Sequence, residues 1–325
     1  MRPLTFAPIL KQTIWGGNKI ILLKHLDAGI GSVGESWELS AVGGNESRVA
    51  GGEHDGRTLG SLVEEYKGEL VGESVYRRFG NTFPLLVKFI DARDDLSIQV
   101  HPDDATARRR GLPRGKTEMW YVMDSEPYAK ILIGLRERLT PEEYAARVAA
   151  KTIVSAIRDY AVRAGDCFFV SAGMIHGICR GTLLAEIQQT SDTTYRIYDY
   201  DRRDKDGKPR QLHTAEAAEA IDYTVRDDYR THYEGKKNCA ETLVTCPYFH
   251  TVRYDIDKSL DIDYTATDSF VALVCVAGKA ILTTDDGGQH VLTAGHTLLL
   301  PASTRHVTVD GTVTFLETTV PEEDM

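Results

Sequence analysis

The sequence predicts a mainly β protein that contains two similar β units and a few inserted helices. Short runs with alternating polar and apolar residues, typical of strands, recur along the chain, for example over residues 97–101. From about residue 240 onward, runs rich in Val, Leu and Thr are separated by Gly and Asp, as in antiparallel sheets. One phrase also occurs twice with the same spacing, which indicates an internal repeat.

The first third of the chain mixes strand and helix signals. Residues 36–41 are strand-like, and the run 83–90 is apolar enough for a buried strand. Between them, apolar residues at spacings of three and four predict helices over residues 58–67 and 74–79. We therefore expect two helices to precede the buried strand.

A distinct helix start follows in the middle of the chain. Thr140 precedes Pro141, and Glu143 lies three residues after Thr140, which is the pattern of a capping box with proline at the first helical position. This pattern predicts a helical segment over residues 140–158. The run rich in Ala and Glu after Thr214 predicts another short helix.

The C-terminal region predicts a series of antiparallel strands. The run from Asp285 to Gly288 supplies a hairpin turn. The strands that we expect are residues 270–276, 279–284, 290–292 and 297–300.

The repeated phrase begins with glycine and ends with histidine. Its two copies, 130 residues apart, are Gly165-x5-Ser171-x-Gly173-x2-His176 and Gly295-x5-Pro301-x-Ser303-x2-His306. Each predicts a turn, an apolar strand, a second turn and a histidine directed inward. The spacing resembles the second conserved motif of the cupin superfamily, which implies two cupin-type jelly-roll β-barrels. No His-x-His or equivalent precedes His306, so we expect that residue to be structural.

This resemblance, with a length of 325 residues, predicts two domains. We expect residues 1–235 to form a metal-binding catalytic cupin domain with helical insertions. Residues 236–325 are expected to form a metal-free, cupin-like C-terminal jelly roll.

Composition argues against several classes of function. The net charge of -10 argues against nucleic-acid binding, and we expect the one dense basic cluster, Arg108–Arg110, to be ordinary surface. No run reaches the roughly 18 apolar residues that a membrane span needs. Five cysteines without a Cys-x-x-Cys motif, in a chain without a signal-like start, predict a reduced, cytoplasmic protein. A small anionic substrate held by a few local cations is compatible with this composition.

Potential metal ligands occur at every second position of one strand-like run. Ser97, Gln99 and His101 therefore share one face of a strand. Together with Glu118 and His176, they offer two imidazoles, one carboxylate and one amide oxygen, a set that suits Zn²⁺ with room for water or substrate. Mn²⁺, Fe²⁺, Co²⁺ or Ni²⁺ could occupy similar ligands.

A competing signal is the run Gly29-Ile-Gly-Ser-Val-Gly34, which fits the glycine fingerprint of dinucleotide-binding proteins. That fingerprint requires a helix after the glycines. Residues 35–40 are strand-like instead, so we expect a glycine-rich loop near the barrel mouth and no nucleotide site.

Several motifs resemble the type I mannose-6-phosphate isomerase family in its shorter bacterial form. They are Trp15-Gly-Gly17, Gly34-Glu-Ser-Trp-Glu38, Ser97-Ile-Gln-Val-His-Pro-Asp-Asp104, Gly115-Lys-Thr-Glu-Met-Trp120, Ala172-Gly-x-x-His-Gly177 and Thr190-Ser-Asp-x-Thr-Tyr-Arg196. The resemblance runs from near residue 10 to at least residue 225.

The resemblance implies roles for individual residues. The ligands that it implies for one zinc ion are His101, Glu118 and His176. Gln99 corresponds to a residue that is a ligand in some members and only adjacent in others. Ser97 and Lys116 match substrate-binding positions, and Arg196 matches the active-site arginine.

The reaction implied by this resemblance interconverts mannose 6-phosphate and fructose 6-phosphate through a metal-stabilised enediol(ate). It needs a general base within about 3 Å of the proton that moves between C1 and C2. Glu186, which faces the same way as Gln188, is one candidate, and a metal-bound water is the other. The sequence leaves both open.

Two other functions fit the same residues. A cupin dioxygenase with a redox metal would consume oxygen, and a non-catalytic sugar-phosphate-binding cupin would bind without turnover. The oligomeric state does not follow from the sequence.

Overall fold

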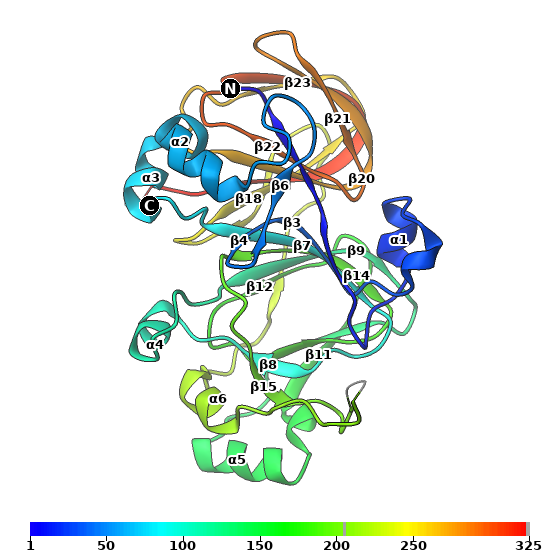
Figure 1. The fold of residues 1–325 in the computed structure, drawn as a ribbon. Coiled ribbons are helices and arrows are strands. Elements are labelled where there is room, and N and C mark those ends of the chain that lie inside the picture. The colour runs from blue at the N-terminus through cyan, green and yellow to red at the C-terminus, as the bar shows by residue number, and fades with distance from the viewer. Residues whose placement is uncertain (204–205, 323–325) are drawn as a thin grey trace.

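The computed structural model describes residues 1–203 and 206–322 and is mainly β, as the sequence predicts. Figure 1 shows two β units, one above the other, with short helices at the periphery. Most strands between residues 9 and 231 build the lower unit, and strands from residue 241 onward build most of the upper unit. This arrangement confirms the predicted fold class of two jelly-roll units with a few inserted helices.

The lower unit is a sandwich of two antiparallel sheets. The seven-stranded sheet has the order β16 (Arg230–Thr231), β12 (Cys167–Val170), β9 (Glu118–Ser125), β14 (Thr182–Gln189), β7 (Leu85–Ala92), β3 (Glu35–Leu39) and β2 (Ile9–Lys11). The five-stranded sheet has the order β11 (Ile157–Ala161), β10 (Lys130–Leu135), β13 (His176–Ile178), β8 (Ile98–Val100) and β15 (Tyr195–Tyr198). Trp120 and Ile90 of the first sheet share a buried cluster with Ile131 and Ile178 of the second, so the sheets pack face to face.

Strand β7 shows why the run 83–90 is almost continuously apolar. All eight of its residues are buried. Val87 and Phe89 face a core that also contains Val274 and Leu316 of the upper unit, whereas Ile90 faces the core of the lower sandwich. A strand buried on both faces cannot alternate between apolar and polar residues. The seven-stranded sheet therefore lies between the two cores.

The upper unit is built on one nine-stranded sheet. Its main order is β17 (Glu241–Thr245), β18 (His250–Ile256), β23 (His306–Thr319), β20 (Val271–Thr284), β22 (Thr297–Leu300), β1 (Leu4–Ala7) and β6 (Arg48–Val49). In addition, β19 (Leu260–Asp263) pairs with β23, and β21 (Gln289–Thr293) pairs with β20. The N-terminal strands β1 and β6 thus complete the sheet of the upper unit. A separate ribbon joins β4 (Ala41–Val42) and β5 (Asn45–Glu46).

The prediction of separate strands over 270–276 and 279–284 is wrong. The two segments are one strand, β20, which pairs with β23 and has an irregularity between Cys275 and Ala277. Gly278 follows at φ +74, and a Cβ there would lie 2.2 Å from the carbonyl oxygen of Thr312. Glycine therefore lets the strand bend and continue where the sequence suggests a break. The predicted turn at 285–288 does connect β20 to β21.

The helices are short, and none in the described ranges has the length and apolar character needed to cross a membrane. They are α1 (Lys19–Leu23), α2 (Leu59–Val71), α3 (Glu73–Phe79), α4 (Asp104–Arg109), α5 (Pro141–Ala149) and α6 (Thr214–Ala220), with 3-10 turns η1 (Ala28–Ile30) and η2 (Ile153–Ala156). The capping box of Thr140 and Glu143 is confirmed. The helix ends at Ala149 rather than near 158, because Lys151 takes φ +59 and Ile157 begins β11, which pairs with β10.

The internal repeat is confirmed, but its two histidines differ. Gly165 and Gly295 both take positive φ, each is followed by a strand, and His176 and His306 each begin the next strand. His176 is fully buried, whereas the side chain of His306 is 61% exposed and lies 3.6 Å from Asp263. The expectation that His306 points inward as a structural residue is therefore wrong. Apolar residues such as Val307 and Val309 fill the interior there.

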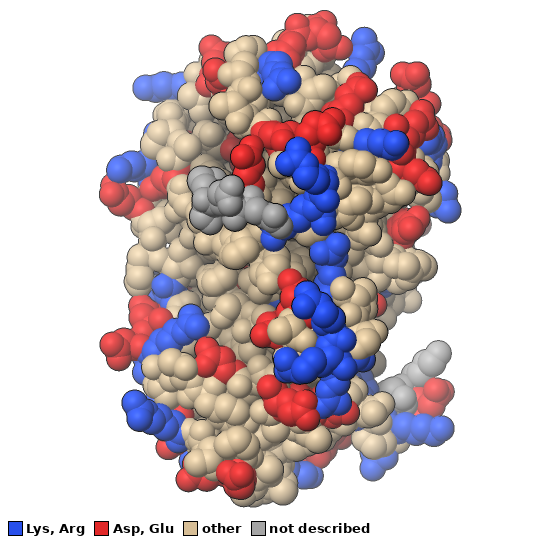
Figure 2. Space-filling view, turned by 90° about the vertical axis from the view of Figure 1, so that its left-hand side faces the viewer, with Lys and Arg blue, Asp and Glu red and all other residues tan. Residues whose placement is uncertain are grey.

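Charged side chains of both signs are interspersed on the surface. On the face in Figure 2, Lys and Arg side chains lie beside Asp and Glu side chains. Arg108–Arg110 are exposed, as predicted, and Arg110 pairs with Glu219 at 2.6 Å. The basic cluster is thus partly neutralised by an acidic neighbour. The glycine run 29–34 is followed directly by β3 and not by a helix, as expected.

We predict that Glu317 makes folding stability depend on pH. Burial raises the pKa of Glu317 from 4.5 to about 7, although the Tyr264 hydroxyl donates a hydrogen bond to it at 2.6 Å. Between these values the folded chain retains a proton that the unfolded chain has lost. The stabilisation is therefore complete below about pH 4.5 and is lost as pH rises through 7. Glu317→Gln should remove a fall of about 3 kcal/mol in the unfolding free energy across this window, measured by denaturant titration.

The exposed residue Glu322 provides the control for this prediction. Glu322→Gln should leave the pH dependence as it is in the unmodified chain. Parallel pH profiles for Glu317→Gln and the unmodified chain would contradict the assignment.

Candidate metal centre and substrate cleft

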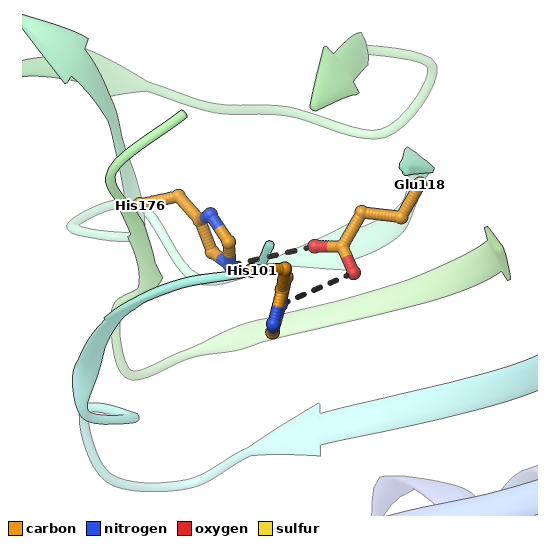
Figure 3. Close-up of side chains that lie close together, drawn as sticks. All are labelled: His101, Glu118 and His176. Carbon is orange, nitrogen blue, oxygen red and sulfur yellow. Dashed lines mark ion pairs between the residues drawn. The ribbon is translucent and has the colours of Figure 1, made fainter. Parts of the chain in front are cut away.

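Three buried side chains meet inside the lower unit. His101 directly follows β8, Glu118 begins β9 and His176 begins β13. Figure 3 shows them pointing toward one another, and their candidate ligand atoms all lie within 4.8 Å of one another. Nε2 of His101 lies 3.5 Å from Oε2 of Glu118, and Nε2 of His176 lies 3.5 Å from Oε1. The fold thus brings together three groups that are far apart in the sequence.

The chemistry of these groups fits a divalent cation. Nδ1 of His101 donates to the carbonyl of Thr193 at 2.8 Å, and Nδ1 of His176 donates to that of Met174 at 2.7 Å. This tautomer directs both Nε2 lone pairs toward Glu118. Burial lowers the pKa of His101 well below its usual value and that of His176 to about 4, so both rings are neutral. Oε1 of Glu118 receives no hydrogen bond from the described residues.

Gln99 lies at the edge of this cluster. In the five-stranded sheet it is the register partner of His176 on one side and of Arg196 on the other. Its Nε2 lies 3.2 Å from Nε2 of His176. The amide end therefore reaches the cluster, and rotation by half a turn would present its oxygen instead.

The loop between β8 and β9 returns Lys116 to the side of His101. Pro102 follows His101, and its carbonyl accepts a hydrogen bond from the Lys116 N–H at 3.0 Å. A Cβ at Gly115 would lie 2.6 Å from the Asp103 backbone, so this close approach requires glycine. As a result, Nζ of Lys116 lies 3.1 Å from Nε2 of His101 and 2.8 Å from Oε2 of Glu118.

A cleft of about 330 Å³ opens next to the cluster. The residues expected at the site that line this cleft are Ser97, Gln99, Lys116, Glu186 and Arg196. His101, Glu118 and His176 lie behind this lining, and Gln99 and Lys116 connect the two regions. All eight expected residues therefore belong to one region of the lower unit.

Glu186 lies opposite two lysines in the cleft. Its Oε2 accepts a hydrogen bond from Trp120 Nε1 at 2.8 Å, and its Oε1 lies 3.2 Å from Nζ of Lys88 and 3.8 Å from Nζ of Lys116. Burial favours the protonated acid, but the two lysines outweigh it and lower the pKa of Glu186. Burial and the charge of Glu186 raise the pKa of Glu118. Glu186 is thus the more readily ionised of the two carboxyl groups.

The side chain of Arg196 has a buried Nε atom that forms no hydrogen bond with the described residues. Arg196 lies on β15, and its Nη1 donates to the carbonyl of Gln211 at 3.0 Å. Burial and the neighbouring Arg210 lower its pKa, although a guanidinium stays charged at neutral pH.

Sequence reasoning missed three charged residues that line the cleft, Glu35, Lys88 and Arg210. Lys88 lies 3.6 Å from Glu35. Its position within the apolar run 83–90 could have identified it, because a lysine in a buried strand requires a partner of opposite charge. No strand or helix pattern in the sequence around Arg210 indicated that it lies at the site. The structure holds it by two hydrogen bonds to the Asp199 carboxylate, at 2.7 and 2.5 Å.

Comparisons with known proteins agree with this geometry. Residues 4–131 match the phosphomannose isomerase type I catalytic domain, and residues 240–320 match the mannose-6-phosphate isomerase cupin domain. The chain is 34% identical to mannose-6-phosphate isomerase ManA of Bacillus subtilis over 92% of this chain and 93% of the relative. It is 33% identical to the mannose-6-phosphate isomerase of Streptococcus mutans over 95% of each chain.

Solved structures give the same result. The crystal structure of mannose 6-phosphate isomerase from Bacillus subtilis matches 98% of this chain and 99% of its own, with a TM-score of 0.88 and 33% identity. A substituted form of phosphomannose isomerase from Salmonella typhimurium has a TM-score of 0.82 over 98% of this chain and 100% of its own, and at 16% identity shows a common fold. On the strength of the curated relatives, the chain belongs to the type I mannose-6-phosphate isomerase family.

Proposed function

We propose that this protein interconverts mannose 6-phosphate and fructose 6-phosphate through an enediol(ate). The observation that carries the proposal is the buried group of His101, Glu118 and His176 directly behind a cleft lined by cations. Membership of the family, and the activity named for its relatives, support the same reaction.

The cofactor that we propose is one zinc ion per chain, held by His101, Glu118 and His176 with Gln99 as a further ligand. Two neutral imidazoles and a carboxylate suit Zn²⁺, and other divalent transition metals accept similar donors. A bound cation would act as a Lewis acid that stabilises negative charge on the substrate oxygens.

Ser97, Lys116, Arg196 and Arg210 are the proposed substrate-binding groups. Three of them are cations in a chain of net charge -10, so an anionic sugar phosphate meets a local positive site. Arg210 is fixed by Asp199 and is suited to a phosphate, which accepts paired hydrogen bonds from a guanidinium. Arg196, with its unpartnered Nε, is placed to stabilise the enediolate oxygen.

For proton transfer we propose Glu186 as the general base. Lys88 and Lys116 keep it ionised, so it can accept the proton from C2 of the aldose and return it to C1 of the enediol. The carbon-bound proton moves from C2 to C1 and the hydroxyl proton moves from O2 to O1, so the two sugars are isomers and no oxidant is needed.

We further propose that residues 1–235 supply the catalytic unit and residues 236–325 a metal-free unit, whose sheet also includes β1 and β6 from the N-terminal part of the chain, with a cytoplasmic location. The one group of three metal-type ligands found among the described residues lies in the first unit. All five cysteines are free, which suits a reducing compartment.

The proposed function is tested by a coupled assay. The zinc-loaded protein should convert mannose 6-phosphate to fructose 6-phosphate at the same rate with and without oxygen. An oxygen requirement would indicate a dioxygenase, and binding without turnover in a fully metallated sample would indicate a sugar-phosphate-binding protein. Either result would refute the proposal.

His101→Ala should abolish zinc retention and activity together. Substitution of a residue that hydrogen-bonds to a metal ligand typically lowers metal affinity 10- to 100-fold, and loss of a direct ligand should lower it further. Zinc content after dialysis, measured by atomic emission, checks this. The matched control is His306→Ala, because His306 is at the repeat-equivalent position of His176 but is exposed. Equal zinc loss in both variants would contradict the assignment.

Arg196 and Arg210 should affect different kinetic constants. Arg196→Ala should keep zinc and lower kcat by roughly 100- to 1000-fold, because it removes charge stabilisation in the transition state. Arg210→Ala should mainly raise KM for mannose 6-phosphate, by about tenfold or more, because it removes a contact to the phosphate. Arg180→Ala, at an exposed position beside Tyr128, is the control. Near-normal kcat in Arg196→Ala would show that its assigned role is wrong.

A further inference from the structure

A second cavity of about 410 Å³ lies apart from the catalytic cleft and shares no lining residue with it. It is formed where the N-terminal segment and β3 meet β21 and β22 of the upper unit. Its walls are largely apolar and include Phe6, Pro8, Leu26 and Leu298. A cavity of this size with mainly apolar walls is typical of small-molecule sites.

The floor of this cavity contains a buried ion pair. Nζ of Lys24 lies 3.0 Å from Oε2 of Glu38, and both side chains are almost fully buried. Lys24 also donates to the carbonyl of Gly295, and Ser36 donates to Oε1 of Glu38 at 2.6 Å. The pair is therefore internally compensated. An anion would be repelled by Glu38 and a cation by Lys24, so the cavity favours an uncharged molecule.

One polar group in the lining has no partner. Thr297 is 7% exposed and lines the cavity, and its Oγ1 makes no hydrogen bond with the described residues. A buried hydroxyl without a partner is unfavourable, because it has lost its hydrogen bonds to water. A molecule with one hydroxyl group could supply the missing hydrogen bond, since a threonine hydroxyl both donates and accepts.

We propose that this cavity binds a small uncharged molecule that has an apolar ring and a hydroxyl group directed at Thr297. The ring packs against Phe6 and Leu298, and the ion pair forms the floor. Such a ligand supplies a partner for Thr297 Oγ1, which has none among the described residues, and leaves the Lys24–Glu38 ion pair intact.

Strand β3 connects this site to the catalytic cleft. Glu38 is at the cavity, and Glu35, three residues earlier on the same strand, lines the cleft and lies 3.6 Å from Lys88. Trp37 pairs with Lys88 and Leu39 pairs with Val87, so Glu38 is the extra residue of a β-bulge. A bulge is a point where a strand bends locally. A ligand packed against this bulge therefore changes the bend of the strand that carries Glu35, which lies 3.6 Å from Lys88, and so changes substrate affinity.

The binding test uses 4-fluorophenol as the probe, observed by fluorine NMR with the metal-loaded full chain. We expect saturable binding that Thr297→Val weakens about fivefold to tenfold, the usual effect of losing one hydrogen bond. Leu26→Trp, which fills the cavity, should abolish it. Thr312→Val, at an exposed position on β23, should leave it unchanged. No saturable binding, or equal affinity in all variants, would overturn the proposed site.

Coupling to the cleft is tested separately and rests on the proposed isomerase activity. Saturating 4-fluorophenol should change KM for mannose 6-phosphate at least twofold in the unmodified chain and not in Leu26→Trp. Binding without any change in KM would overturn the coupling. Since the binding test needs no turnover, its result stands even if the chain proves not to be an isomerase.

Discussion

Two backbone carbonyl groups fix the Nδ1 protons of His101 and His176, and the Nε2 lone pairs therefore face Glu118 inside the protein. Acids and cations alternate around this arrangement: Lys116 lies 2.8 Å from Glu118 and Lys88 lies 3.2 Å from Glu186. Oε1 of Glu118 receives no hydrogen bond from the described residues. A buried carboxylate oxygen without a partner is costly, and a divalent cation between it and the neutral imidazoles would offset that cost. The organisation of the cleft depends on this requirement.

Strand register determines which groups meet. In the five-stranded sheet, His176 pairs with Gln99, and Gln99 pairs with Arg196, so one row crosses three strands. In the seven-stranded sheet, Glu186 pairs with Lys88. A slip of one residue in either sheet would turn these side chains to the opposite face. The two apolar cores on either side of β7 oppose such a slip, so packing remote from the site maintains its geometry.

Much of this could be predicted from local patterns. Alternation placed Ser97, Gln99 and His101 on one face, and the repeated phrase identified His176. Local sequence patterns gave wrong predictions where contacts between distant parts of the chain determine the structure. Continuation of β20 through Gly278 depends on its partner β23, and the exposure of His306 depends on apolar residues that already fill the upper unit. Arg210 could not be found, because its position comes from an ion pair with Asp199.

The central claim is that one cation binds to His101, Glu118 and His176 beside an open cleft. Anomalous X-ray diffraction at the zinc edge, from crystals of active metal-loaded protein, tests it most directly. The account predicts one peak bonded to Nε2 of both histidines and to the carboxylate of Glu118, with a coordination position facing the cleft. A peak bonded to other residues, or active crystals with no peak at this site, would contradict it.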